Sequence, residues 1–332
     1  MAKILYSTDL GKYYLGECTK QLKILAKQKT IKGKVQLIIT SPPFPLNKKK
    51  EYGNLEGDEY VEWISKLAPL FSELLAEDGS IVIEIGNGWE KGRPVQSLLS
   101  MKSLIAFLEN PDANLRLCQE FICYNPARLP SPAQWVTINR IRTIDSFTHV
   151  WWMAKSDYPK ADNKKVLRPY SKSMEKLFKK GTYNAGKRPS DHIISEDGFL
   201  TRHEGSIMPN FLEFEPVNPG DKVRLPQNTL KIANTKSNDY FTRRCKKLDM
   251  VPHPARMPME LVSFFIEFLT DEGDLVLDPF GGSNTTGFCA ERLKRRWISI
   301  ELNSKYGKQS AIRFEDPTIN ANLTKGSNWD EY

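Results

Sequence analysis

Short apolar runs and amphipathic stretches alternate along most of this chain. Buried β-strands are predicted where β-prone apolar runs end in turn residues, at 35–40, 81–85, 121–124, 148–153, 274–278 and 297–301. Helices are predicted where apolar residues recur at helical spacing, at 58–75, 97–108, 258–269 and 285–293. Strands that alternate with helices predict an α/β fold whose parallel, doubly wound sheet is covered on both faces.

The segment 155–251 interrupts this alternation. It is rich in Lys, Asn, Pro and Ser and has no sustained hydrophobic period, so it predicts a separate lobe. The sheet would then be formed by residues 1–154 together with residues 252–315. The polar stretch 316–332 is predicted to be a tail.

The excess positive charge lies in the predicted lobe. The whole chain has 48 Lys plus Arg and 40 Asp plus Glu, which gives a net charge of +8. Between Lys155 and Arg256 there are 21 basic and 12 acidic residues, a balance of +9 that leaves −1 for the remainder. A basic lobe on a near-neutral body favours a polyanionic partner such as nucleic acid, although solvated surfaces also carry such charge.

Neither a membrane nor a metal is indicated. The apolar runs are much shorter than the ~20 residues of a membrane helix, and the start at Met1 does not resemble a secretory signal. Five cysteines without a CxxC pair argue against a disulfide framework and a cysteine zinc site. His149, His192 and His203 show no metal-ligand spacing. We therefore expect a cytoplasmic protein without a metal.

A glycine-rich turn follows the predicted strand at 274–278. Asp278 ends that strand, and the turn 279–284 leads into a helix start where unpaired N–H groups and glycine backbone can approach a ligand. The P-loop and dinucleotide fingerprints are both absent. Glu301 ends the next strand, where a carboxylate can accept from ribose hydroxyls. The pattern favours a nucleoside ligand, with a tight turn and a helix cap as the alternative.

A second turn, Ser41-Pro42-Pro43-Phe44, ends the predicted strand at 35–40. Two consecutive prolines fix two φ angles and hold Ser41 extended, so the carbonyl oxygens are rigidly aimed. Phe44 adds a flat face that suits a planar ring with an exocyclic amine, although a proline turn can also merely end a strand. Because both turns follow the carboxyl ends of parallel strands, one site could hold a nucleoside cofactor and an amine-bearing base.

These turns resemble motifs of the S-adenosylmethionine-dependent amino methyltransferases that act on DNA. The motifs are Ser41–Phe44, His253–Arg256 and Asp278–Thr286, and their order resembles that of the β class. Three further segments resemble more narrowly the PvuII-type N4-cytosine methyltransferases: Lys49–Asn54, Leu129–Pro132 and Val150–Trp152. The resemblance extends roughly from Tyr14 to Phe314. Asn284 departs from it, because many members carry Gly there.

The resemblance implies a Rossmann-like, mostly parallel, seven-stranded methyltransferase sheet with circularly permuted motifs and a target-recognition lobe at 155–251. It implies S-adenosylmethionine as the methyl donor, with Phe280 near the adenine and Glu301 at the ribose. It also implies which residues surround the methionine portion and complete the cofactor pocket: Asp278, Gly282, Ser283, Thr285, His253 and Arg256. Glu17 occupies a position where members usually carry Asp against the adenine amine.

The implied reaction is methyl transfer to the exocyclic N4 of a cytosine flipped out of duplex DNA. The predicted catalytic residues are Ser41, Pro42, Pro43 and Phe44, with Ser41 Oγ and the Pro42 carbonyl accepting from the amine. Ser at position 41 favours cytosine over the N6 of adenine, which remains an alternative, as does an inactive DNA-binding relative. Methyltransferases that act at carbon 5 use a cysteine thiolate in a Pro-Cys motif. No cysteine of this chain follows a proline, so methylation at carbon 5 is disfavoured.

Two basic clusters are the predicted phosphate contacts, with a solvated surface as the alternative interpretation. They are Lys48, Lys49 and Lys50, and Arg243, Arg244, Lys246 and Lys247. The residues that read the bases are expected within 155–251. By resemblance, the setting is a bacterial or phage restriction-modification system, in which a cognate restriction endonuclease acts on the same site.

Overall fold

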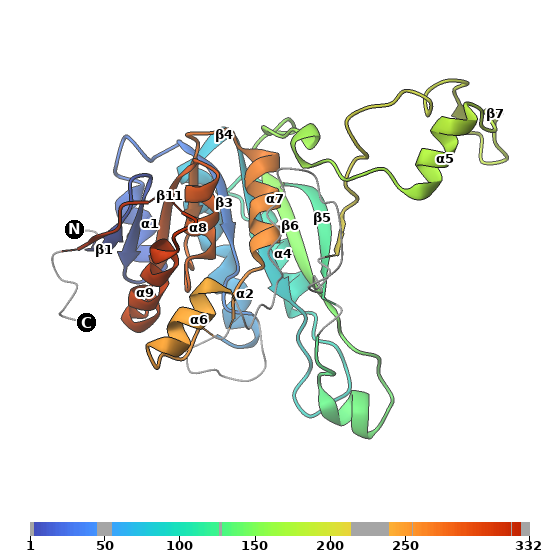
Figure 1. The fold of residues 1–332 in the computed structure, drawn as a ribbon. Coiled ribbons are helices and arrows are strands. Elements are labelled where there is room, and N and C mark those ends of the chain that lie inside the picture. The colour runs from blue at the N-terminus through green and yellow to red at the C-terminus, as the bar shows by residue number, and fades with distance from the viewer. Residues whose placement is uncertain are drawn as a thin grey trace.

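A ten-stranded mixed sheet runs through the part of the chain that the structure describes (Figure 1). The computed structural model describes residues 3–44, 55–125, 128–213, 239–253, 255–319 and 321–326. In spatial order, the strands are β12 (Thr324–Lys325), β1 (Lys3–Ser7), β2 (Gly11–Leu15), β11 (Arg296–Glu301), β10 (Leu275–Asp278), β3 (Val35–Thr40), β4 (Leu75–Gly86), β6 (Phe147–Ala154), β5 (Arg116–Tyr124) and β9 (Phe211–Glu213).

Five of the nine neighbouring strand pairs are parallel, and β2, β11, β10, β3 and β4 form one continuous parallel block. The α/β prediction is confirmed, but the number of seven strands was wrong for the described residues. The three additional strands are β1, β9 and β12, which lie at or next to the two sheet edges. Strands of two or three residues, such as β12 and β9, are too short to show an alternating pattern in sequence.

Helices cover both faces of the sheet. One face carries α1 (Cys18–Leu25), α2 (Gly57–Ser65), α3 (Leu67–Leu74) and α4 (Leu99–Leu108). The other carries α7 (Met259–Leu269), α8 (Thr285–Arg292) and η3 (Ala311–Glu315), with α9 (Ser304–Ser310) leading into η3. Neighbouring residues of β3 point to opposite faces, since Ile38 joins the first core and Leu37 and Ile39 join the second.

The predicted helix at 58–75 is two helices in the structure. Pro69 has no N–H to donate to the Ser65 carbonyl, so a continuous helix cannot form through this point. That carbonyl accepts instead from the Asn110 side chain at 2.9 Å. The predicted turn at 78–80 lies inside β4, which is continuous from Leu75 to Gly86.

The described residues of the predicted lobe lie in several places. Residues 155–167, with η2 (Asn163–Val166), pack against the amino-terminal end of β10, where Lys160 pairs with Asp274 at 2.9 Å. Helix α5 (Lys172–Lys180) and the hairpin β7 (Gly186–Lys187) and β8 (Ile193–Ile194) project away from the sheet (Figure 1). Strand β9 joins β5, and α6 (Tyr240–Lys247) packs against η3. The lobe boundaries remain predictions.

Candidate active site

The two predicted turns meet at one edge of the sheet. Their strands β3 and β10 are parallel neighbours, so their carboxyl ends lie together. Thr40 Oγ1 donates to Asp278 Oδ1 at 2.7 Å, and the Phe280 amide donates to the same oxygen at 3.0 Å. Thr286 Oγ1 donates to Asp278 Oδ2 at 2.7 Å. Burial raises the pKa of Asp278 although these bonds oppose the shift. The buried carboxyl therefore ties the proline turn to the glycine turn.

Backbone conformation explains the residues of the glycine turn. Gly282 has φ +46°, and a Cβ on Gly281 would lie 2.9 Å from the Ser299 Cβ. Asn284 has φ +55°, a conformation that Gly and Asn adopt more readily than other residues. Asn can therefore occupy the position where the resemblance implies Gly.

The Asn284 side chain also supports the start of α8. Its Oδ1 accepts from the Gly287 amide at 3.0 Å and from Ser299 Oγ at 2.7 Å. Its Nδ2 donates to the Tyr6 hydroxyl at 2.8 Å. All of these groups are buried, so the turn is held rigidly from behind.

Arg313 is a buried residue of the site region that no sequence motif indicated. Its Nε donates to the Ser283 carbonyl at 2.6 Å, and its Nη2 lies 3.2 Å from Ser283 Oγ and 3.3 Å from Thr285 Oγ1. Its guanidinium also lies over the Phe241 ring at 4.4 Å. Burial lowers the pKa of Arg313 to about 10, which leaves it charged at neutral pH. The Arg313 guanidinium therefore orients the hydroxyls of Ser283 and Thr285, two residues that were predicted to bind the cofactor.

Glu301 lies at the end of β11 beside the glycine turn, as predicted. Its carboxylate accepts from the Gly282 amide at 3.0 Å and from the Asn303 amide at 2.7 Å. Burial raises the pKa of this carboxyl, and hydrogen bonds from the Asn303, Gly282 and Leu302 amides oppose the shift. Because a carboxylate has about four acceptor positions, Glu301 keeps capacity for a ligand hydroxyl.

Glu17 lies next to Glu301 in space because the Gly16 amide donates to the Glu301 carbonyl at 2.8 Å. Its side chain caps α1, accepting from the Thr19 and Lys20 amides at 2.9 Å each. Burial acts to raise the pKa of Glu17, but these hydrogen bonds outweigh it and lower the value. The contact of Glu17 with an adenine amine stays a prediction.

The proline turn is backed by a buried acid, Glu84 near the end of β4. The hydroxyls of Ser41 and Thr148 both donate to its carboxylate, the latter at 3.0 Å. Burial raises the pKa of Glu84 to about 7. Glu84 meets Ser41 only because β3 pairs with β4 in this register. The sequence does not show this pairing, so the residue was not predicted. Phe44 packs so closely on Gly86 that a Cβ there would lie 2.6 Å from its ring.

The remaining predicted cofactor residues lie around the glycine turn. Phe280 is half-buried and meets the Trp63 ring edge-on at 5.6 Å between centroids. His253 faces Gly282, whose added Cβ would lie 3.3 Å from the His253 Nε2. Arg256 is held by α6 through Asp239 at 3.4 Å and Thr242 at 3.2 Å. His253 thus borders the turn directly, whereas Arg256 contacts the helix beside it.

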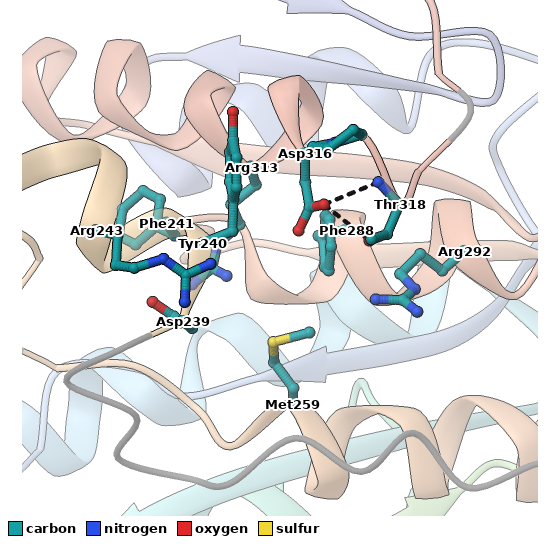
Figure 2. A pocket seen from close by; sticks show the side chains of 11 residues that line it. Asp239, Tyr240, Phe241, Arg243, Met259, Phe288, Arg292, Arg313, Asp316 and Thr318 are labelled. Atoms are coloured by element: carbon teal, nitrogen blue, oxygen red, sulfur yellow. Dashed lines mark hydrogen bonds between the residues drawn. The ribbon is translucent and has the colours of Figure 1, made fainter. Parts of the chain in front are cut away.

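The two basic clusters differ in what can be said of them. Lys48, Lys49 and Lys50 lie outside the described residues. The cluster Arg243, Arg244, Lys246 and Lys247 lies on α6, where Arg244 pairs with Glu315 at 3.3 Å. Figure 2 shows Arg243 at a cavity of about 340 Å³ that Arg292 and the buried Arg313 also line. Contact of these clusters with DNA phosphate stays a prediction.

Cysteine and metal chemistry find no support in the described part of the chain. All five cysteines are free and four are buried, and burial raises the pKa of every thiol. A thiol of raised pKa is a poor nucleophile at neutral pH. Among the described residues no group of three or more His, Cys, Asp or Glu is placed to hold a metal, and no helix could cross a membrane.

Several known proteins are similar to this chain. The N6/N4 DNA methylase family matches residues 35–312. The type II methyltransferase M.PvuII of Proteus hauseri is 39% identical over 319 residues, 96% of this chain and 87% of that protein. The solved PvuII DNA methyltransferase (cytosine-N4-specific) matches with TM-score 0.71 and 35% identity, over 96% of this chain and 91% of that one. The M1.HpyAVI–SAM complex shares the fold at TM-score 0.50 and 19% identity, over 92% of this chain and 99% of that one.

Proposed function

Because this chain belongs to the N6/N4 DNA methylase family, we propose that it methylates the exocyclic N4 of cytosine in duplex DNA, with S-adenosylmethionine as methyl donor. One observation carries the proposal. The Thr40–Asp278 hydrogen bond joins the amine-binding turn to the nucleoside-binding turn, so base and cofactor would meet in a single site. Similarity to the cytosine-N4-specific PvuII enzyme supports cytosine as the target base.

The residues of the glycine turn fit S-adenosylmethionine. Gly281 and Gly282 let the turn pack closely against Ser299 and His253, because added Cβ atoms would lie 2.9 Å and 3.3 Å from these residues. The half-buried Phe280 offers an apolar face for adenine, and Glu301 keeps acceptor capacity for ribose hydroxyls. Ser283 and Thr285 would lie near the methionine portion. When bound, S-adenosylmethionine supplies an electrophilic methyl group on its sulfonium.

Ser41 and Pro42 would prepare the cytosine amine for attack. The amine is a poor nucleophile because its lone pair is delocalised into the ring. Ser41 donates its only proton to Glu84, and its hydroxyl oxygen would accept from one amine proton. The Pro42 carbonyl would accept from the other. Hydrogen bonds to both amine protons favour a pyramidal nitrogen whose lone pair can attack. Phe44 would stack on the flipped base, which stabilises it by about 1–3 kcal/mol.

Glu84 would accept the proton that the amine loses. A carboxyl whose pKa is about 7 is well matched to proton transfer at neutral pH. Ser41 lies between Glu84 and the base, so a proton can pass from the amine to Ser41 while Ser41 passes its own proton to Glu84. In this scheme Glu84 positions Ser41 and is the final proton acceptor.

The proposed biological role is protection of host DNA in a restriction-modification system. In such a system a cognate endonuclease cleaves the same site when it is unmethylated. Expression of this protein in a host that carries a plasmid with mapped sites should make those sites resistant to the partner endonuclease. Endonucleases that recognise other sites should still cleave the plasmid.

Nucleoside analysis tests the proposed activity. Purified protein is incubated with duplex DNA and methyl-labelled S-adenosylmethionine, and the digested nucleosides are separated by chromatography. We expect the label in N4-methylcytosine. Label in N6-methyladenine alone would replace cytosine by adenine as the target. Failure to bind S-adenosylmethionine in calorimetry would instead indicate an inactive DNA-binding relative.

A further inference from the structure

An arm of the chain projects beside the catalytic turn. We define the β5–β6 arm as residues 128–146, which connect β5 to β6 and include η1 (Gln134–Ile138). Strands β4 and β5 are both antiparallel to β6, so they run in the same direction and end at the same edge as β3. The arm leaves the sheet at this edge, in mid-green at the bottom of Figure 1.

Both ends of the arm are fixed to the region that holds Ser41. At one end, Arg128 donates to the Phe147 carbonyl at 2.7 Å, and its charge acts on the Glu84 carboxylate. At the other end, Asp145 accepts from the Asn87 side chain at 2.9 Å. Asn87 directly follows Gly86, against which Phe44 packs. The base of the arm is therefore in contact with the residues that support the catalytic turn.

The arm is ordered between these two ends. The Ile141 amide donates to the Trp135 carbonyl and the Asn139 amide to the Gln134 carbonyl, both at 2.9 Å. Arg142 Nε donates to the Pro94 carbonyl at 2.9 Å, which braces the arm against the neighbouring loop. The tip is consequently held in one position relative to the catalytic edge.

The surface of the arm is apolar and positively charged. Leu129 is 80% exposed and Ile138 is 68% exposed, and Ile141 and Ile144 are also exposed. Residues 128–144 contain three arginines, Arg128, Arg140 and Arg142, and no Asp or Glu. Single exposed apolar side chains are ordinary, but a concentration of them on one segment marks an interaction surface. The single acid of the arm, Asp145, lies at its base and accepts from Asn87, so the arm is net positive and complements a polyanion.

We propose that the β5–β6 arm is a DNA wedge, in which Leu129 and Ile138 occupy the space that the target cytosine leaves when it flips out. This inference rests on the proposed methylation of duplex DNA. Proteins that distort a duplex commonly insert apolar side chains between bases. Flipping costs a few kcal/mol of unpairing and unstacking, and an inserted side chain restores apolar contact to the bases on either side. The arginines of the arm would contact the adjacent phosphates.

The wedge predicts a defect that depends on base pairing. The recognition site is first mapped in DNA that the wild type has methylated, and a synthetic duplex with this site is prepared. The test compares single-turnover methylation of this duplex by the wild type and by the double variant Leu129→Ala/Ile138→Ala. We expect a loss of about tenfold or more, equivalent to about 1.4 kcal/mol. On a duplex with an abasic nucleotide opposite the target cytosine, flipping requires no unpairing. The total cost of flipping is lower there, so the variant should lose less activity than it does on the paired duplex.

Ile105→Ala is the matched control, because Ile105 is also an exposed isoleucine, at 52%, but lies on α4. It should methylate both duplexes at the wild-type rate. The exposed positions of Leu129 and Ile138 make misfolding of the double variant unexpected, and a thermal unfolding curve like that of the wild type checks this.

An equal loss on paired and abasic duplexes would overturn the wedge, because it would show that the arm only binds DNA or another copy of the protein. Wild-type rates on both duplexes would overturn it as well. If the wild type itself methylates no DNA, the proposed function fails and the wedge fails with it. That result is distinct, since the first two outcomes require an active wild type.

Discussion

Replacing Glu84 by Gln tests the proposed role of the buried acid behind Ser41. Gln has nearly the same shape and keeps one oxygen to accept from Ser41 and Thr148, but it cannot take a proton. If Glu84 is the final acceptor, the wild-type single-turnover rate should rise with pH through about 7, the pKa of this carboxyl, and then level off. The Gln variant should lose this rise and be slower by about a hundredfold at pH 8.

The same residue should contribute to the pH dependence of stability. The folded protein binds the Glu84 proton more tightly than the unfolded chain, because burial raises the pKa from 4.5 to about 7. Its contribution to stability is fully present below about pH 4.5 and is lost as the pH rises to about 7. The pKa difference corresponds to roughly 3 kcal/mol. The free energy of unfolding of the wild type should therefore decrease as the pH rises from about 4.5 to about 7. The Glu84→Gln variant should lack the part of this decrease that Glu84 causes.

The assays are single-turnover methylation and urea unfolding, each between pH 5 and 8.5. Glu267 is a matched control, because burial also raises its pKa to about 7 although it lies on α7. Glu267→Gln should change the stability profile in the same direction and leave the rate profile unchanged. A Glu84→Gln variant that keeps the rise in rate through pH 7 would refute the proton-acceptor role. A change of the rate profile in Glu267→Gln would show that the profile reports stability instead.

Three further variants test the rest of the site. Ser41→Ala should lower the methylation rate by about a hundredfold with calorimetric affinity for S-adenosylmethionine unchanged, and equal losses in both would contradict contact with the base. Asn284→Ala should be less stable in urea unfolding than Asn284→Gly by about 1 kcal/mol, because Ala is strained at positive φ; the opposite order would contradict the backbone argument. Arg313→Lys cannot reproduce the guanidinium contacts with Ser283 and Thr285. It should weaken S-adenosylmethionine binding about tenfold, and unchanged affinity would show that these contacts do not shape the cofactor site.

The parts of the fold that carry strong local patterns could be predicted from sequence. Strand β3 was predicted with the bounds that the structure has, and β10 and β11 each differ by one residue at the start. The two turns follow directly from those strand ends. Long apolar runs and Gly or Pro breaks fix such features locally, so no tertiary information is needed.

Contacts between segments distant in sequence could not be predicted in the same way. Glu84 and Ser41 are 43 positions apart, and the hydrogen bond between them depends on strand pairing and register. Arg313 has no motif, and its function depends on the packing of η3 against the glycine turn. Within the predicted lobe, α6 and its Asp239 cap were not predicted because the helix is short and highly charged. These residues are found only when the strand order and the helix positions are known.

The most direct test of the account is the nucleoside composition of DNA from a methylation-deficient host that expresses either the wild type or Ser41→Ala. The account predicts N4-methylcytosine in DNA from the wild-type strain, little or none with Ser41→Ala, and equal protein levels in both strains. Two results for DNA from the strain that expresses the wild-type protein would contradict the assignment of this chain as a cytosine-N4 methyltransferase. One is N6-methyladenine as the only methylated base. The other is no methylated base although the purified protein binds S-adenosylmethionine.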